Sequence, residues 1–349
     1  MNDKAFFTKR LLQWNTHNNK RWMPWKGEKD PYKIWISEII LQQTRVIQGL
    51  EYYNRFILKF PNVHSLAKAK ENDVFKVWEG LGYYSRCKNI ITSSKFIANE
   101  LQGNFPDKYE DLLQLRGVGV YTASAIASFA YNLPHAVVDG NVFRVLSRYF
   151  GNKIPVDSKE GKVIYNQLAG ELLDTSNPAL YNQAIMDFGA EVCKPAVPLC
   201  TICPLKTKCI AWLNDLQDVL PVKEKRIKKT HRYFYYLQIK YKNKVYVRKR
   251  IAKDIWQNLF EFFLIETSRQ LSVSALLKTG ALKKILPANF QIEKTSPYCK
   301  QQLTHQTITG QVITVSIKDK LVIPGYHIIS EREMAGLAFP QFITACLKD

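Results

Sequence analysis

The chain has 349 residues, of which 50 are Lys or Arg and 30 are Asp or Glu, so its formal net charge is +20. This length suggests two domains, and a composition with 46% hydrophobic and 23% charged residues excludes a globally disordered protein. No apolar run approaches the ~18 residues of a membrane span, and the first residues lack the apolar segment of a secretory signal. We therefore expect no membrane partner and a cytoplasmic protein, associated with the nucleoid if the source is bacterial.

The excess of positive charge indicates a polyanionic partner. Nucleic acid is the leading candidate, because Lys and Arg side chains that neutralise phosphates release condensed counterions. An anionic membrane surface is disfavoured without a basic amphipathic helix. A protein that is basic but has no polyanionic partner is the remaining alternative.

Residues 1–215 are predicted to form a mainly α domain, because apolar residues recur there at helical spacing. Asp30-Pro31 is typical of an N-cap followed by proline at the first helical position. The predicted helical stretches are 34–47, 66–78, 90–101, 121–131 and 181–189.

Residues 232–349 are predicted to form an α+β domain, because their apolar segments are rich in aromatic and β-branched residues. The predicted strands are 233–239, 244–248, 260–265 and 312–317, and the predicted helices are 272–286 and 340–347. The linker between the domains, 216–231, is basic: residues 223–232 hold six Lys or Arg and one acid. It either lies along phosphate or is a solvated spacer.

Four of the seven cysteines are close together in the sequence, with the spacing C-x6-C-x2-C-x5-C. Four thiolates at this spacing suit one tetrahedral metal ion or one cubane cluster. Disulfides are disfavoured because nothing marks the chain as secreted. The four are Cys193, Cys200, Cys203 and Cys209, and the other three, Cys87, Cys299 and Cys346, are expected to be core residues.

Two acids and a glycine pair are candidate site residues. Glu38 lies in a nearly apolar helical run, where burial would raise its pKa and let it act as a general acid, although a purely structural acid is the alternative. Asp139 is the second acid, with an N-cap or turn role as its alternative. Gly117 and Gly119 permit a tight turn that brings backbone N–H groups close to an anion.

These motifs together resemble a known superfamily. The cysteine spacing is similar to the [4Fe–4S] loop of endonuclease III-type DNA glycosylases, and residues 115–123 resemble their helix-hairpin-helix. The segment 37–44, Ser-Glu-Ile-Ile-Leu-Gln-Gln-Thr, closely resembles the S-E-x-x-L-Q-Q-T string of adenine DNA glycosylases (MutY-type). The resemblance implies a [4Fe–4S] cluster, with zinc as the chemical alternative.

The resemblance also implies a division of chemical roles. Glu38 would protonate the departing adenine, Asp139 would stabilise the positive charge on the sugar or capture it covalently, and Asn141 would help position these groups. Tyr121 stands where the lyase branch has a nucleophilic lysine, and a phenol cannot form a Schiff base. Hydrolysis without a lyase step is therefore expected.

The remaining residues carried over by resemblance bind DNA or the extruded base. Gln43 would wedge into the base stack, and Tyr83 would insert beside the lesion. Where the family has Pro and often Arg in the hairpin, this chain has Arg116 and Val120. The predicted DNA and base contacts are Arg21, Trp25, Lys26, Gln43, Thr44, Tyr83, Gly117, Gly119 and Gln183, of which Gln183 replaces a family Glu.

The second domain resembles the Nudix-like domain with which adenine DNA glycosylases recognise 8-oxoguanine. Residues 256–262 are similar to its W-x-x-L-[WFY]-x-F segment, and the acidic Nudix box is absent, so the domain should bind rather than hydrolyse nucleotides. Residues 303–305 stand where the family has Phe-Ser-His. Thr304 and His305 would then bond the Hoogsteen edge of 8-oxoguanine, while Leu303 lacks the family's aromatic ring.

The predicted function is excision of adenine mispaired with 8-oxoguanine or guanine in double-stranded DNA, by a monomer that leaves an abasic site. A thymine or oxidised-pyrimidine glycosylase of the endonuclease III branch is one alternative, disfavoured by Tyr121 and by the long second domain. A non-enzymatic mismatch-binding protein is the other alternative.

Overall fold

The structure is a computed structural model that describes residues 3–44, 46–224, 229–283 and 285–348. Contacts between Cα atoms divide it into two compact units. The first unit comprises residues 1–67 and 92–226, and the second comprises 68–91 and 227–349. Residues 68–91 thus belong to the same compact unit as the C-terminal part of the chain. A division of the chain into consecutive domains places them in the N-terminal domain instead.

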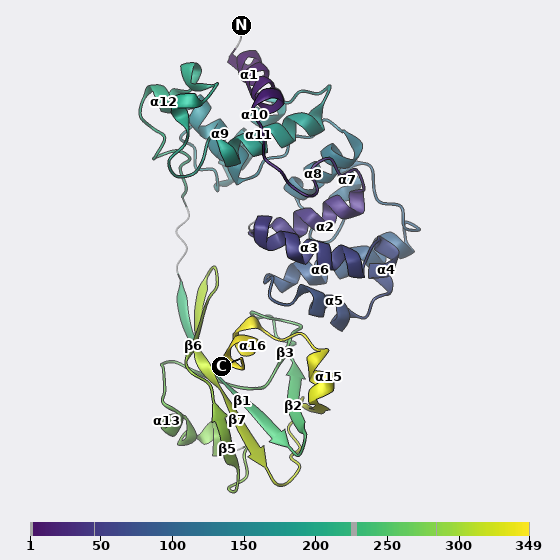
Figure 1. Cartoon of the computed structure of the whole chain (residues 1–349), viewed down its shortest axis with the longest axis vertical. Coiled ribbons are helices and arrows are strands. Elements are labelled where there is room, and N and C mark those ends of the chain that lie inside the picture. The colour runs from purple at the N-terminus through teal and green to yellow at the C-terminus, as the bar shows by residue number, and fades with distance from the viewer. Residues whose placement is uncertain (1–2, 45, 225–228, 284, 349) are drawn as a thin grey trace. The chain divides into compact units, whose positions relative to one another are not determined.

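The first unit is helical, as predicted (Figure 1). Its N-terminal helices include α2, which is buried at eight of its positions because nearly all of its residues are apolar. Asp30 caps α2 through a hydrogen bond of 2.9 Å from Tyr32 N, and Pro31 follows at the first position, as predicted. The helices are α1 (Asp3–His17), α2 (Pro31–Leu41), α3 (Val46–Lys59), α4 (Val63–Lys68), α7 (Tyr109–Leu112), α8 (Val120–Tyr131), α9 (Gly140–Phe150), α10 (Lys159–Leu172), α11 (Pro178–Glu191) and α12 (Ile210–Leu213).

Three predicted helices are each divided in two. The stretch 34–47 ends at Leu41 and resumes at Val46, with Gln43 in the left-handed region at φ 58°. The stretch 66–78 divides into α4 and α5 (Glu71–Trp78), and 272–286 divides into α13 (Val273–Leu277) and α14 (Gly280–Lys283). Apolar spacing continues across each break, so periodicity alone does not locate the turn.

The core of the first unit joins α1, α9, α10 and α11. Gly189 lets α11 approach the start of α9, because a Cβ at this position would lie 2.7 Å from Asn141 Cβ. The close approach holds the first turn of α9, which carries two predicted site residues, directly against α11.

The second unit is built on a mixed sheet with helices packed against it, and so contains both strands and helices, as predicted (Figure 1). Within the described residues the sheet has eight strands in the order β3-β2-β1-β7-β5, with β4 beside β1, β6 beside β7 and β8 beside β2. The strands are β1 (Thr230–Tyr241), β2 (Lys244–Lys249), β3 (Phe260–Glu261), β4 (Phe263–Thr267), β5 (Gln291–Thr295), β6 (Cys299–Gln302), β7 (Gln306–Ile317) and β8 (His327–Ser330). β1 and β7 pair in parallel over their full length.

Helices pack against both sides of β1. Tyr235 and Leu237 join the core formed with α13 and α14. Tyr236 packs instead against Phe342 of α16 (Gln341–Cys346), with ring centroids 6.2 Å apart. Burial on both faces explains why β1 is apolar without strict alternation. The unit also contains α6 (Tyr84–Asn99) in part and α15 (Glu331–Ala335).

One cysteine expectation is wrong. Cys299 of β6 and Cys346 of α16 form a disulfide, with Cα atoms 5.9 Å apart, although they are separated by 47 positions in sequence. The sheet brings α16 onto β6, a long-range packing that local sequence does not reveal. Cys87, the third of this group, is fully buried as expected. None of the helices in the described residues has the length and apolar composition needed to cross a bilayer.

Candidate active site

Glu38, which is buried, and Tyr121, which is partly buried, form a hydrogen-bonded pair where α2 packs against α8. The Tyr121 hydroxyl donates a hydrogen bond of 2.7 Å to Glu38 Oε2. Burial raises the pKa of Glu38 most, the bond from Tyr121 lowers it, and the charge of Asp139 raises it again, giving a pKa of about 7. Burial also raises the pKa of Tyr121 well above its usual value, so the phenol stays neutral. Glu38 can therefore hold and release a proton near neutral pH.

The glycine turn positions Tyr121. Gly117 has φ 82°, a left-handed conformation that a residue with a Cβ rarely adopts. Gly119 is the N-cap of α8 and has no side chain there, so the backbone N–H groups of the first turn are uncovered. The side chain of Ser93 donates to the Arg116 carbonyl at 3.0 Å, which ties the turn to α6. The geometry agrees with the predicted hairpin, while its phosphate contact stays a prediction.

Asp139 is the N-cap of α9, and this cap holds its carboxylate in place. It accepts hydrogen bonds from Asn141 N and Val142 N, both at 2.8 Å, and from Asn141 Nδ2 at 2.7 Å. Burial raises the pKa of Asp139, and these donors together with Arg144 oppose the rise. Among the described residues, three hydrogen-bond donors favour the charged form of Asp139, whereas Glu38 accepts one hydrogen bond, from Tyr121.

Arg144 connects this acid to the cysteine loop. Its Nη2 donates to Asn141 Oδ1 at 2.8 Å and to the Gly189 carbonyl at 2.7 Å, and its Nε donates to the Cys193 carbonyl at 2.7 Å. Arg144 as a whole is 7% exposed, so these bonds are largely shielded from water. Asn141 is thus held between Asp139 and Arg144.

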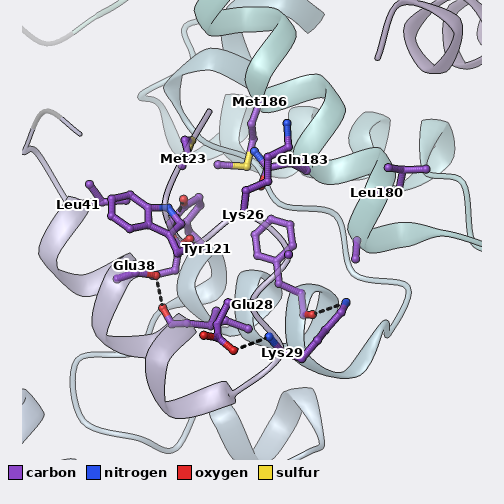
Figure 2. Close-up of a pocket in the computed structure, with 16 residues that line it drawn as sticks. Met23, Lys26, Glu28, Lys29, Glu38, Leu41, Tyr121, Leu180, Gln183 and Met186 are labelled. Carbon is purple, nitrogen blue, oxygen red and sulfur yellow. Dashed lines mark hydrogen bonds between the residues drawn. The ribbon is translucent and has the colours of Figure 1, made fainter. Parts of the chain in front are cut away.

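A cavity of about 300 Å³ opens beside Glu38, at the lower end of the range for ligand pockets. Figure 2 shows Glu38 of α2 on one side of it and Gln183 and Met186 of α11 on the other. Trp25, Lys26 and Gln183, three of the predicted base contacts, line the cavity together with Glu38 and Tyr121. Asp139 and Asn141 are not among the lining residues.

Arg21, one of the predicted DNA and base contacts, is bonded to a buried acid of α11. Its guanidinium does not line the cavity and instead donates to Asp187 Oδ1 at 2.8 Å. Lys26 and Gln183 donate to the same carboxylate. Sequence reasoning missed Asp187, although an acid inside the apolar stretch 181–189 is the same signal that identified Glu38.

A second carboxyl in the cavity was also missed. Glu28 Oε1 accepts hydrogen bonds from Lys29 N at 2.9 Å and Asp30 N at 3.0 Å. Burial raises the pKa of Glu28, but these bonds and the ion pair with Lys33 outweigh it, so the pKa is lowered. Glu28 is therefore charged where Glu38 is able to hold a proton. The sequence marks Glu38 by its apolar run, but nothing in the polar segment around Glu28 indicates that this acid lines the same cavity.

The predicted lesion contacts lie in the second unit. The hydroxyls of Tyr83 and Thr304 share a hydrogen bond. Tyr83 is 41% exposed and has φ 49°, and Thr304 lies in the turn between β6 and β7 that Leu303 N closes onto the Gln306 carbonyl at 2.7 Å. His305 follows in the same turn and is exposed. Two motifs far apart in the sequence are thus side by side.

Gln43 and Thr44 lie in the turn between α2 and α3. Gln43 takes up a left-handed backbone conformation, which is uncommon for a residue other than glycine. In the basic linker, residues 225–228 lie outside the described residues, and β1 begins at Thr230. The roles of Gln43, Thr44 and the linker stay predictions.

The four clustered cysteines follow α11 on a loop with two short turns, Cys200–Ile202 and Lys206–Lys208. All four are free and partly buried. Burial raises the pKa of Cys203 to about 12; a backbone hydrogen bond lowers it, and the charges of the other three cysteines raise it. Arg148 Nη1 donates to Cys193 Sγ at 3.6 Å.

The spacing of the four cysteines allows two kinds of bound group, a single tetrahedral metal ion or a cubane cluster. Across the described part of the chain, no three His, Cys, Asp or Glu side chains converge as ligands of one metal ion. In a cubane each cysteine binds its own iron, so the sulfurs stand farther apart than the ligands of a single ion. Four thiols on one short loop, with a guanidinium donor beside one of them, have the ligand chemistry that an iron–sulfur cluster requires.

The fold and the paired acids define the class of protein, and comparison with known proteins agrees. Residues 36–163 match the model of the HhH-GPD superfamily of base excision DNA repair proteins. A thermostable thymine-DNA glycosylase is 27% identical with a TM-score of 0.56, and the match covers 60% of this chain and 97% of that one. Endonuclease III in a complex with DNA shares the fold, at 19% identity and a TM-score of 0.51 over 61% of this chain and 96% of that one.

Sequence relatives identify the family within this class. The adenine DNA glycosylase of Buchnera aphidicola subsp. Acyrthosiphon pisum is 40% identical over 262 residues, 74% of each chain. The adenine DNA glycosylase of Mus musculus is 40% identical over 60% of this chain and 42% of its own. The chain belongs to the adenine DNA glycosylase family.

Proposed function

We propose that the protein acts in base excision repair on duplex DNA, where it hydrolyses the N-glycosidic bond of adenine mispaired with 8-oxoguanine or guanine. Membership of the adenine DNA glycosylase family supports both the base and the DNA substrate. The observation that carries the proposal is a carboxyl with a pKa of about 7 at the wall of a cavity of about 300 Å³.

The side chains divide the reaction between them. Extruding adenine costs a few kcal/mol of stacking and pairing and brings the base into the cavity. Glu38 then donates its proton to the purine as the bond to the sugar breaks, while Tyr121 holds the carboxyl in place. Asp139 stabilises the positive charge that develops on the sugar. Water completes the reaction, and no amine stands at position 121 to form a Schiff base.

The cavity offers polar groups that suit the edge of adenine. The indole N–H of Trp25 is buried and has no hydrogen-bond partner in the part of the chain that the structure describes. A buried donor without a partner indicates a ligand or an ordered water at that place. The amide of Gln183 lies in the same cavity. We infer that these two groups bind the extruded base.

Tyr83 and Thr304 are proposed to read the base opposite the adenine. Their shared hydrogen bond couples an exposed aromatic ring, suited to stacking, to a hydroxyl suited to the N7–H of 8-oxoguanine. His305 adds an exposed imidazole beside them. Because guanine lacks the N7–H donor, this group of residues distinguishes the two purines at their Hoogsteen edge.

The lesion reader is tested by replacing both polar side chains of its turn. Thr304→Ala with His305→Ala should reduce the excision rate opposite 8-oxoguanine by roughly tenfold, the worth of one or two hydrogen bonds, and leave the rate opposite guanine nearly unchanged. Tyr83→Phe keeps the ring, removes the bond to Thr304 and should give a smaller loss of the same kind. Equal losses on both duplexes would contradict the assignment. Single-turnover excision on the two duplexes provides the measurement.

The four cysteines are proposed to hold a [4Fe–4S] cluster, as the donor set allows. The cluster would order the loop that carries Lys194, Lys206 and Lys208. Anaerobically purified protein should then be yellow-brown, with broad absorption near ~400 nm. Cys203→Ala should abolish the colour, whereas Cys87→Ala, at a buried cysteine outside the loop, should keep it. A colourless protein with stoichiometric zinc would contradict the proposal.

One assay distinguishes the proposed function from its alternatives. Base release is measured on duplexes that carry either adenine or thymine glycol as the target. Release of adenine but not of thymine glycol excludes an oxidised-pyrimidine glycosylase, and release of any free base excludes a protein that only binds mismatches. Adenine opposite 8-oxoguanine should be the faster adenine substrate. The division into 1–215, 216–231 and 232–349, the Nudix-like character of the second domain and the monomeric state stay predictions.

A further inference from the structure

The residues assigned to the base pocket by resemblance converge on a carboxylate that the resemblance did not name. Asp187 of α11 is fully buried. Its Oδ1 accepts from Arg21 Nη1 and Gln183 Nε2, both at 2.8 Å. Its Oδ2 accepts from Asn19 Nδ2 at 2.9 Å and Lys26 Nζ at 2.8 Å. A carboxylate offers about four lone-pair sites, so every site is occupied.

Two of the four donors are cations, and they form ion pairs with the buried carboxylate at 2.8 Å each. The side chains of Arg21 and Lys26 are 19% and 33% exposed, so the ion pairs are largely shielded from water. Removing either the acid or its charge would leave these cations without their partner. Asp187 therefore ties the segment before α2 to α11 across the wall of the cavity.

The charge on Asp187 decides which end of the Gln183 amide faces the cavity. A carboxylate can only accept hydrogen bonds, so the NH2 group must point toward Asp187 and the carbonyl Oε1 must point away from it. Gln183 lines the cavity, and within the described residues its side chain bonds only to Asp187. An amide that could otherwise present a donor or an acceptor is thus fixed with its acceptor free.

We propose that Asp187 is a positioning residue for base specificity: through Gln183 it presents a hydrogen-bond acceptor to the 6-position of the extruded purine. Adenine carries an amino donor at this position, whereas hypoxanthine carries a carbonyl acceptor. The oriented Gln183 amide therefore favours adenine and repels hypoxanthine. The inference rests on the proposed function, because it requires adenine to occupy this cavity.

The test compares adenine with hypoxanthine, both opposite 8-oxoguanine, for the full-length protein. Asp187→Asn keeps the shape but lets residue 187 donate, so the Gln183 amide can turn over. The ratio of kcat/KM for adenine to that for hypoxanthine should fall roughly tenfold, the worth of one hydrogen bond. Both values come from one preparation, so a smaller folded fraction cancels in the ratio.

A double-mutant cycle with Gln183→Met separates orientation from general damage. Gln183→Met alone should lower the ratio to a similar extent, and adding Asp187→Asn to it should change the ratio little further. The proposal would be overturned if Asp187→Asn left the adenine-to-hypoxanthine ratio unchanged. It would also be overturned if Asp187→Asn lowered this ratio just as much in the Gln183→Met background, where the amide is absent. If Asp187→Asn does not fold, an unchanged ratio in Gln183→Met overturns it instead. Failure of the wild-type protein to release adenine would refute the proposed function, a separate result.

Discussion

Glu38→Gln should slow the single-turnover release of adenine by roughly 10²–10⁴-fold, the contribution of one general acid, and should leave binding to the mispaired duplex near its wild-type level. The amide has the shape of the carboxyl and can still accept the hydrogen bond from Tyr121, but it has no acidic proton to donate. In the wild-type protein, the rate should fall as pH rises above about 7, because Glu38 then loses its proton. The variant should lack this alkaline decline.

Glu28→Gln is the matched control. Glu28 lines the same cavity, but its pKa is lowered by bonds from backbone N–H groups and by the ion pair with Lys33, so it carries no proton near neutral pH. We expect its replacement to change the rate far less than Glu38→Gln does. If the Glu38 variant retained a near wild-type rate, or if the Glu28 variant lost the alkaline decline, the general acid would be misassigned.

Stability provides an independent measurement of the same pKa. Burial raises the pKa of Glu38 from 4.5 in the unfolded chain to about 7 in the folded protein. The contribution of Glu38 to the free energy of unfolding is therefore fully present below pH 4.5, and it is lost as the pH rises through the folded-state pKa of about 7. The loss amounts to about 3 kcal/mol, from ~1.4 kcal/mol per pKa unit. Glu38→Gln should therefore stabilise the protein relative to wild type at pH 8 and much less at pH 5. Lost activity together with gained stability would exclude unfolding as the cause.

The sequence was informative wherever function depends on a local pattern. An acid in an apolar run behind an Asp-Pro cap predicts a buried carboxyl on a helix, and Glu38 of α2 is 6% exposed. Glycines one residue apart predict a tight turn, and Gly117 has the left-handed conformation that such a turn needs. These features follow from a few neighbouring residues, so no long-range packing is required to foresee them.

Features that depend on packing between distant segments were not predictable in this way. The bond between Glu38 and Tyr121 exists because α2 packs against α8, and the parallel pairing of β1 with β7 joins residues 230–241 to 306–317. The disulfide of Cys299 and Cys346 depends on α16 reaching β6. In each case the sequence contains the residues but not the contact, because loop closure over long separations is governed by the whole fold.

Asp187 lies between these two cases. Its burial could have been inferred from its position in the apolar stretch 181–189, as for Glu38, but its partners come from the segment before α2. Two acids in similar helical contexts thus have opposite surroundings: one faces a single phenol donor, and the other faces two cations and two amides. The chemistry of a buried acid is therefore set by what packs around it, not by its own helix.

Asp139→Asn should slow base release by roughly 10²–10³-fold, the cost of losing one preorganised electrostatic stabiliser. Asparagine is as good an N-cap as aspartate, so α9 should remain intact while the negative charge beneath the sugar is lost. Asp30→Asn, the same change at the N-cap of α2, is the control and should keep the rate within a few-fold. A comparable loss in both variants would mean that capping, rather than charge, is what the reaction needs.

The pH profile makes this assignment sharper. Asp139 must be charged and Glu38 protonated, so the wild-type rate should decline on both sides of an optimum. Burial raises the pKa of Asp139, so the acid limb should lie above the usual range of an aspartate, and Asp139→Asn should remove it. The charge of Asp139 is also one of the causes that raise the pKa of Glu38, so its removal should move the alkaline limb of the residual activity to lower pH. An alkaline limb that stays in place would show that the two acids do not interact as the structure requires.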